Sequence, residues 1–254
     1  MENILRKRLL AGEIQLGAFL GMGSTPVAEI TGQAGFDWCL IDGEHGVNSL
    51  PMIRDQLVAL ASVNCPAIVR VADKAPWMLK QVLDIGAQTV LVPMVDTASQ
   101  ARAVAAAARY APVGTRGLAV GVVRASDYGA NTDYTQQAND QICLMVQAES
   151  RAAVDNIDAI AAVEGVDCVF IGPMDLAADM GCPGQTNAPE VMAAIAHIME
   201  RTRAAGKAVA MFCLAPDQVS RYIDMGATVI AVASDVALLT QTMRSRVSEV
   251  RDQI

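Results

Sequence analysis

Long apolar runs and excess positive charge are both missing from this chain of 254 residues. No apolar run reaches the roughly 18 residues that a membrane-spanning helix needs, so no membrane partner is expected. The first ten residues, MENILRKRLL, have no long apolar core and no small-residue cleavage site, so we expect no signal peptide. The net charge of −8 and the pI of about 4.7 argue against nucleic acid or an anionic membrane surface as a partner.

Paired cysteines are also absent, because the six cysteines stand singly and form no CxxC motif. Four of them lie inside apolar, strand-like runs. Thiols in such surroundings are typical of reduced core residues in a cytoplasmic protein, and a metal or redox role is less favoured. The six are Cys39, Cys65, Cys143, Cys168, Cys182 and Cys213.

What the chain does contain is a regular alternation of short β-branched runs and longer Ala-rich amphipathic segments. The predicted strands are residues 15–20, 38–41, 67–71, 89–92, 142–146, 168–171, 208–212 and 228–232. The predicted helices include residues 51–61, 76–85, 99–110, 152–163, 190–205 and 216–225. This alternation predicts a single α/β domain over residues 1–254, a (β/α)8 TIM barrel, because buried parallel strands read as unbroken apolar runs.

A doubly wound open sheet is the alternative fold. Its marker, a GxGxxG turn after the first strand, is incomplete in GMGSTP, where Pro26 occupies the place of the third glycine. Five glycines follow apolar helical stretches and are expected to end those helices, namely Gly35, Gly86, Gly165, Gly206 and Gly226. Residues 111–141 do not fit the alternation, and a connection of that length is typical of a lid or a contact surface.

Polar side chains follow several of the predicted strands, and catalytic groups of such barrels lie at the carboxyl ends of the strands. The residues in question are Asp42, Glu44 and His45 in LIDGEHG, Arg70 after the third strand, Gln147 and Glu149 after the fifth, and Asp175 after the sixth. Structural roles remain open for two of them. Glu149 could complement a helix dipole from the first turn of a helix, and Asp175 could cap the next helix.

Two acids without a histidine or cysteine cluster suit a hard divalent cation such as Mg²⁺, Mn²⁺ or Co²⁺. A 2-oxo acid could chelate such a cation, which would stabilise an enolate as a Lewis acid while Arg70 shares the charge. The GPMD stretch, Gly172, Pro173, Met174 and Asp175, offers backbone N–H groups at an expected helix start for the substrate carboxylate. His45 is the expected acid/base because imidazole titrates near neutral pH.

Several longer motifs resemble the HpcH/HpaI family of class II, metal-dependent pyruvate aldolases. They are AGFDWCLIDGEHG, PAIVRV, LKQVLDIGAQTVLVPMV, ARYAPVGTRG, VQAES and EGVDCVFIGPMDLAADMG, and together they span nearly the whole chain. Relatives often read VQIET and GPADLS where this chain has VQAES and GPMDLA. Met174 is bulkier than the usual small residue, but the contact expected there is through the backbone.

The resemblance implies a role for each matching position. It places the metal-binding acids at Glu149 and Asp175, the histidine base at His45 and the transition-state arginine at Arg70. It places substrate contacts at Gln147 and on the main chain around Met174 and Asp175. An acid that raises the basicity of the histidine falls on Asp84, which we expect near a helix end on the opposite face of its own barrel.

The family is typically hexameric, a trimer of dimers with a helix exchanged between subunits. The resemblance therefore implies a homohexamer with a C-terminal helix exchanged, in which Asp84 could reach His45 of a neighbour. It also implies reversible cleavage of a 4-hydroxy-2-oxo acid into pyruvate and an aldehyde. We expect Asp42 and Glu44 to orient His45 or to hold metal-bound waters, and neither to be a direct metal ligand. We expect the segment after GTRG to reach a mouth, its own or a neighbour's, and to help select the aldehyde, which the sequence does not identify.

Three other readings compete with the class II aldolase. A Schiff-base aldolase needs a lysine at the mouth, and only Lys74 lies beyond a strand end. An acyl-CoA lyase of the citrate-lyase type would share the barrel and the metal, but no basic cluster suits a CoA phosphate tail. A non-catalytic barrel that only binds a keto acid would have little use for a base such as His45.

Overall fold

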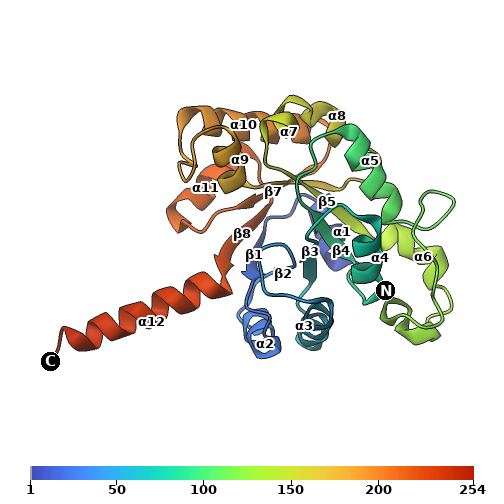
Figure 1. Cartoon of the computed structure of the whole chain (residues 1–254), viewed down its shortest axis with the longest axis horizontal. Coiled ribbons are helices and arrows are strands. Elements are labelled where there is room, and N and C mark those ends of the chain that lie inside the picture. Colours follow the sequence, from blue (N-terminus) through green and yellow to red (C-terminus); the bar gives the residue numbers. More distant parts are fainter. Residues whose placement is uncertain (1) are drawn as a thin grey trace.

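The computed structural model describes residues 2–254, and its centre is a closed barrel of eight parallel strands (Figure 1). The strands are β1 (Gln15–Leu20), β2 (Trp38–Asp42), β3 (Ala67–Arg70), β4 (Thr89–Val92), β5 (Cys143–Ala148), β6 (Cys168–Ile171), β7 (Ala208–Phe212) and β8 (Val229–Ser234). Each strand pairs with the next along the chain, and Gln15 of β1 pairs with Val229 of β8 to close the ring. The predicted (β/α)8 barrel is confirmed, and the closing pair excludes an open sheet.

Helices surround the barrel and connect its strands. They are α1 (Ile4–Leu10), α2 (Thr25–Gln33), α3 (Leu50–Ser62), α4 (Pro76–Asp84), α5 (Ala98–Ala107), α6 (Tyr134–Gln141), α7 (Arg151–Asp155), α8 (Ile157–Ala161), α9 (Pro173–Asp179), α10 (Pro189–Ala204), α11 (Pro216–Met225) and α12 (Asp235–Arg251), with a 3₁₀ helix, η1 (Arg124–Gly129). The helix predicted over 152–163 is broken at Asn156, whose side-chain amide donates to the carbonyls of Asp96 and Ala152. Within residues 2–254, no helix is both long and apolar enough to span a membrane.

The five glycines that were expected to end helices all have positive φ angles, between 71° and 110°. Left-handed backbone of this kind is what a helix terminus requires and what glycine adopts without steric cost. The predicted helix ends are therefore confirmed. Gly226, at the end of α11, is itself the C-cap residue of its helix. Each of the other four glycines lies one or more residues after the C-cap of its own helix.

The barrel interior is filled by one set of strand residues and closed at its base by α1. Trp38 is fully buried there, and a Cβ on Gly17 would lie 2.1 Å from its ring, so only glycine fits opposite it. Leu5 and Leu9 of α1 pack against the same interior cluster. Burying side chains of this size stabilises the fold by about 1.5–3 kcal/mol each.

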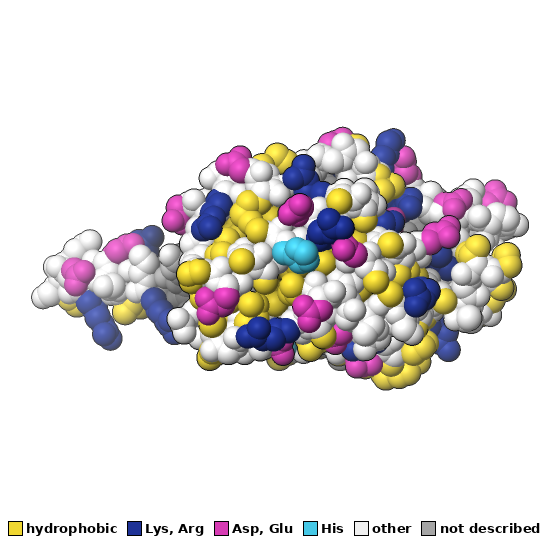
Figure 2. Space-filling view, turned by 90° about the horizontal axis from the view of Figure 1, so that it is seen from above, with side chains coloured by type: hydrophobic (Ala, Val, Ile, Leu, Met, Phe, Trp, Pro, Cys, Tyr) yellow, Lys and Arg dark blue, Asp and Glu magenta, His cyan; other side chains and the backbone are white. Residues whose placement is uncertain are grey.

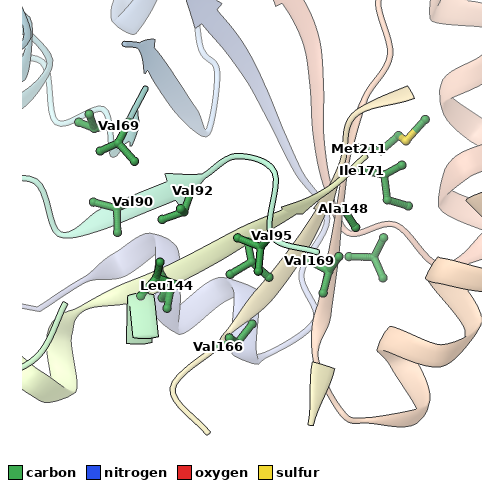
Figure 3. Close-up of a cluster of buried hydrophobic side chains, with 14 of the residues drawn as sticks. Val69, Val90, Val92, Val95, Leu144, Ala148, Val166, Val169, Ile171 and Met211 are labelled. Atoms are coloured by element: carbon green, nitrogen blue, oxygen red, sulfur yellow. The ribbon is translucent and has the colours of Figure 1, made fainter. Parts of the chain in front are cut away.

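The alternate residues of the same strands face outward and pack against the helices (Figure 3). In β4, Val90 and Val92 lie in this outer layer while Leu91 lies inside the barrel. The alternation has period two because successive side chains of a strand point to opposite faces. It brings the polar residues at the carboxyl ends of β2, β3 and β5 to the inside of the barrel mouth.

The long connection over residues 111–141 lies at the amino-terminal side of the barrel. Arg124 donates to the carbonyl of Ile85 at the end of α4, and the backbone N–H of Asn3 donates to Gln141. None of the described residues of this segment lines the cavity at the mouth of its own barrel. We expected this segment to reach the mouth of its own barrel or that of a neighbour, and the first of these two alternatives is therefore wrong. Leu118 and Val122 are exposed on it.

Candidate active site

The carboxyl ends of the strands surround a cavity of about 320 Å³. Its walls contain most of the residues that the sequence nominated, from β2, β3, β5 and the turn after β6. The lining residues are Phe19, Gly21, Asp42, His45, Gly46, Arg70, Gln147, Phe170, Gly172, Pro173, Met174, Asp175, Phe212, Ser234 and Val236. The mouth of the barrel is therefore the candidate active site.

Arg70 is the last residue of β3 and is almost fully buried. Its Nε and Nη2 atoms donate to the two carboxylate oxygens of Asp42 at 2.8 and 2.7 Å, and Nη1 lies 2.8 Å from Glu44 Oε2. The guanidinium carbon is 5.3 Å from the centre of the Phe19 ring. Burial alone would lower the pKa of Arg70, but the hydrogen bonds and charge of Asp42 and the charge of Glu44 raise it overall.

His45 lies on the turn that follows β2. The turn is held by Asp42 Oδ1, which accepts from the backbone N–H groups of Glu44 and His45 at 3.0 and 3.3 Å. The imidazole is 65% exposed, and its Nε2 atom is 3.6 Å from Glu44 Oε2. It is therefore open to a substrate or a water molecule while keeping a carboxylate beside it, as a general base requires.

Glu149 follows β5 and is almost fully buried beneath the cavity wall. It precedes Ser150, the N-cap of α7, so our expectation that it lies in the first turn of a helix was wrong. Its Oε1 atom accepts from the backbone N–H of Met94 at 2.8 Å, and Oε2 accepts from the side-chain amide of Gln147. Burial raises the pKa of Glu149 to about 7 despite these two donors.

Asp175 lies in the first turn of α9, two residues after Pro173, and lines the cavity. The N-cap residue is Gly172, so Asp175 does not cap this helix. A Cβ on Gly172 would lie 2.4 Å from Glu149 Oε2 and 2.9 Å from Gln147 Nε2. Only glycine therefore lets the chain pass over these side chains. Met174 is half-exposed at the rim.

The charges at the mouth fit a bound divalent cation. Asp42, Glu44, Glu149 and Asp175 face one arginine, which leaves three negative charges unbalanced when all four acids are ionised. Burial raises the pKa of Glu44 as well as that of Glu149, and the charge of Asp175 raises both further. Gln147 Oε1 is buried and has no hydrogen-bond partner among the described residues.

The donor set fits a hard cation that keeps open coordination positions. Within residues 2–254, no three His, Cys, Asp or Glu side chains form a ready metal cluster. Glu149 and Asp175 would supply two oxygen ligands, and water or substrate oxygens would supply the rest. This arrangement is the usual one for Mg²⁺, which is held by one or two carboxylates and keeps several waters.

Asp84 is the one nominated residue that the chain does not bring to its own mouth. It is the last residue of α4, at the opposite end of the barrel, and its Oδ1 atom accepts from Arg116 Nη2 at 2.7 Å. The Arg116 guanidinium lies over the Tyr110 ring at 4.5 Å, and its side chain is fully buried. The Asp84 side chain keeps 19% exposure.

Two features of the mouth were not predicted from the sequence. Phe19, Phe170 and Phe212 line the cavity, and Phe19 contacts the other two rings with centroids 6.1 and 5.0 Å apart. Asp235, at the start of α12, accepts from the backbone N–H groups of Gly21 and Met22 and so fixes the turn after β1. The inward positions of period-two strands were the signal that could have identified the phenylalanines.

No lysine is among the described residues that line the cavity. Lys74, the candidate for a Schiff base, instead donates from Nζ to the carbonyl of Met94 at 2.9 Å. Among the described lining residues, Arg70 is the only basic side chain besides His45, and Asp42 accepts from its Nε and Nη2 atoms, so only Nη1 remains for a ligand. These contacts weigh against both the Schiff-base reading and a site for a polyphosphate.

Fold and cavity together define a (β/α)8 barrel with a candidate active site at the carboxyl ends of its strands, which is where enzymes of this fold have theirs. Residues 15–242 match the HpcH/HpaI aldolase/citrate lyase family, and the chain belongs to that family. The family resemblance of the sequence motifs is thereby confirmed.

Named relatives are similar over almost the whole chain. The hydroxypyruvate/pyruvate aldolase of Agrobacterium fabrum is 48% identical over 244 residues, which cover 96% of this chain and 92% of that protein. The 2-keto-3-deoxy-L-rhamnonate aldolase of Klebsiella pneumoniae is 44% identical over 248 residues, covering 98% and 93%. The crystal structure of a family member from Burkholderia cenocepacia matches with a TM-score of 0.94 at 38% identity, covering 98% and 99% of the two chains. The expected enzyme class, an aldolase, is confirmed.

Proposed function

We propose that this protein is a divalent-metal-dependent aldolase that reversibly cleaves a 4-hydroxy-2-oxo acid into pyruvate and an aldehyde. The observation that carries the proposal is the meeting of His45, Arg70, Gln147 and Asp175 around one cavity, with Glu149 directly behind its wall. The two relatives are a hydroxypyruvate/pyruvate aldolase and a 2-keto-3-deoxy-L-rhamnonate aldolase, which supports the same substrate class.

Glu149 and Asp175 are the residues that would hold the cation, Mg²⁺, Mn²⁺ or Co²⁺. When bound, it supplies a Lewis acid that polarises the 2-oxo group of the substrate. Met174 and Asp175 line the cavity from the first turn of α9, where backbone N–H groups have no partner within the helix and would receive the substrate carboxylate. The amide of Gln147 lines the same wall and orients the bound acid.

His45 performs the proton transfer in this proposal. Its exposed imidazole accepts the proton of the 4-hydroxyl group, directly or through a water molecule, and the adjacent Glu44 carboxylate stabilises the resulting imidazolium. Electrons of the C3–C4 bond then pass toward the 2-oxo group as the aldehyde leaves. Arg70 stabilises the negative charge of the pyruvate enolate until a proton is returned to C3.

Assembly with further copies of the chain is part of the proposal. Helix α12 projects from the barrel as an arm in both views, and it exposes Leu238, Leu239, Met243 and Val247 (Figures 1 and 2). Exposed apolar rows of this kind mark an interaction surface. We propose that α12 is exchanged with a second copy in a homohexamer, a trimer of dimers, and that Asp84 of one copy reaches His45 of another.

The alternatives are less well supported by the site. An acyl-CoA lyase needs a basic surface for the CoA phosphates, whereas the face in Figure 2 has acidic and basic side chains interspersed. A barrel that only binds keto acids would not need an exposed histidine beside a carboxylate. The six unpaired cysteines support a cytoplasmic location for the enzyme.

The decisive experiment measures pyruvate release from a panel of 4-hydroxy-2-oxo acids, with and without EDTA, and after Mg²⁺, Mn²⁺ or Co²⁺ is restored. We expect EDTA to abolish release and metal to restore it, and the ranking within the panel begins to identify the aldehyde. Release that EDTA leaves unchanged would remove Glu149 and Asp175 from the mechanism. Persistent binding of pyruvate without any turnover would favour the binding-only barrel.

The intersubunit role of Asp84 is tested by mixing two inactive variants. His45→Ala and Asp84→Ala each lack one of the two groups, so hybrid assemblies restore some complete sites if the two groups come from different copies. Subunit exchange followed by an assay is expected to recover activity that neither variant shows alone. No recovery, in mixtures that mass spectrometry shows to be hybrid, would contradict the intersubunit pairing.

A further inference from the structure

We propose that Asp42 is the positioning residue for Arg70: it fixes one edge of the guanidinium and leaves Nη1 as the nitrogen that turns from Glu44 to the substrate. This inference rests on the proposed function, in which Arg70 stabilises the enolate. It adds a residue that acts through the arginine, and it assigns different roles to the nitrogen atoms of the guanidinium group. Asp42 itself need not touch the reacting atoms.

The hydrogen bonds on Asp42 are unusually complete for one carboxylate. Its Oδ2 atom accepts from Arg70 Nη2 at 2.7 Å, and Oδ1 accepts from Arg70 Nε at 2.8 Å. The same Oδ1 atom accepts from the backbone N–H groups of Glu44 and His45. One side chain thus links the arginine, the base and the turn between them.

The two carboxylates that contact Arg70 hold it in different ways. Asp42 engages the Nε–Nη2 edge with both oxygens, a bidentate geometry that fixes the plane of the guanidinium. Glu44 meets only Nη1, through one oxygen, and the same oxygen also faces His45 Nε2 at 3.6 Å. A single contact is easier to exchange than a forked one, so Nη1 is the nitrogen that can pass to a substrate oxygen.

Burial explains why this arrangement is needed. Asp42 and Arg70 side chains are each 8% exposed, so water cannot hold the guanidinium once the fork is lost. Glu44 and the buried Glu149 both attract Arg70 electrostatically. Without Asp42 the guanidinium would turn toward these acids, and its Nη1 atom would no longer face the substrate.

The test uses chemical rescue of an arginine variant by free guanidinium ion at concentrations that do not denature the protein. Arg70→Ala leaves a space in which a guanidinium ion can bind, and Asp42 would hold that ion by the same forked contact. We expect the ion to raise kcat/KM of Arg70→Ala by about tenfold or more, the value of one charge-assisted contact. Rescue should persist in Arg70→Ala/Glu44→Gln and disappear in Arg70→Ala/Asp42→Asn.

A double-mutant cycle provides the second measurement. Asp42→Asn is expected to lower kcat/KM by roughly 10²-fold in the natural sequence and by less than about threefold in Arg70→Ala, because Asp42 acts through Arg70. Equal losses in both backgrounds, or equal rescue with and without Asp42, would overturn the inference. An Arg70→Ala variant with full activity would instead contradict the proposed role of Arg70. Failure of this inference and failure of the proposed function therefore give different results.

Thermal unfolding of every variant is the control that shows whether the variant is folded. Asp42→Glu is a second variant that keeps the charge and moves the carboxylate by one methylene. If the forked geometry matters, it should stay impaired and show weak rescue in the Arg70→Ala background. If Asp42 only neutralises a buried charge, Asp42→Glu should recover the activity of the natural sequence, and the inference fails.

Discussion

Two buried arginines occupy opposite ends of this barrel, and their similarities make their differences informative. Arg70 at the mouth and Arg116 at the amino-terminal side each pair with an aspartate at 2.7 Å. Each also lies over an aromatic ring, Phe19 at 5.3 Å and Tyr110 at 4.5 Å. By residue type, burial and partners, the two sites are nearly alike.

They differ in what remains for a ligand. Arg70 lines a cavity of about 320 Å³, and its Nη1 atom is held by a single carboxylate oxygen. The side chain of Arg116 is fully buried, and its Nε atom has no hydrogen-bond partner among the described residues. A buried arginine therefore indicates chemistry only where part of its hydrogen-bonding capacity faces a cavity. Within one chain, Arg116 is a structural residue.

The largest expected effect on kcat/KM comes from the replacement of arginine by lysine at these two positions. Lysine keeps the positive charge and removes the planar guanidinium group. Arg70→Lys should lower kcat/KM by about 10²-fold, because an ammonium group cannot reproduce the bidentate contact. Arg116→Lys is the matched comparison and should change kcat/KM by less than about threefold, because it keeps a cation beside Asp84 and leaves that carboxylate in place. Steady-state kinetics of both variants provide the measurement. Equal losses would mean that the proposed action of Asp84 on a neighbouring copy's His45 needs the guanidinium group of Arg116 and not only its charge.

Two glycines sharpen the same comparison. A Cβ on Gly172 would crowd Glu149 and Gln147, so Gly172→Ala should lower kcat/KM by roughly 10- to 10²-fold and weaken metal binding. Gly86, at the amino-terminal side, has a φ of 106°, so alanine there should cost about 1–2 kcal/mol of stability and leave kcat/KM unchanged. Kinetics, metal titration and urea unfolding separate the two effects. Gly121→Ala is the neutral control, since nothing lies within 4 Å of its Cβ position. Normal metal affinity in Gly172→Ala would contradict this prediction, because it would mean that Glu149 can shift away from the new Cβ atom without weakening metal binding.

The mouth could be predicted from the sequence because its geometry follows from strand periodicity. Apolar runs that end in Asp42 and Arg70 place those side chains inside the barrel at the carboxyl ends of the strands. This placement does not depend on how the helices pack. The predicted fifth strand, 142–146, ended too early because Gln147 is polar. In the structure β5 continues to Ala148, and Gln147 pairs with Phe170 of the next strand.

The pair of Arg116 and Asp84, at the amino-terminal side of the barrel, could not be predicted in this way. Arg116 lies in the irregular connection over 111–141, where no period assigns a side chain to the inside or the outside. Its burial depends on Tyr110 and Tyr134, whose rings meet edge to face only after the chain has folded. Whether the pair has a function depends on a second copy of the chain, which no local pattern describes.

The removal of charge from Arg116 tests how much the closed pair contributes to stability. Arg116→Met keeps most of the volume over Tyr110 but leaves Asp84 without its partner. Asp84 retains 19% exposure, so water compensates in part, and we expect a loss of about 1–3 kcal/mol in urea unfolding. An unchanged free energy of unfolding would indicate that the pair is maintained for assembly rather than for the stability of one chain.

The smallest expected effect is on the acid limb of stability. Burial alone would raise the pKa of Asp42, but the hydrogen bonds and charge of Arg70 lower it below its ordinary value. Because the pKa is lower in the folded state, the ionised carboxylate stabilises the fold above the unfolded-state pKa of about 3.9. This contribution is lost as the pH falls through the lower, folded-state value. The stability difference between the natural sequence and Asp42→Asn should therefore be constant from about pH 7 to pH 5 and shrink below about pH 4. Urea midpoints across that range provide the measurement, and a difference that stays constant down to about pH 3 would mean that the Arg70–Asp42 fork is not what separates the two ends of the barrel.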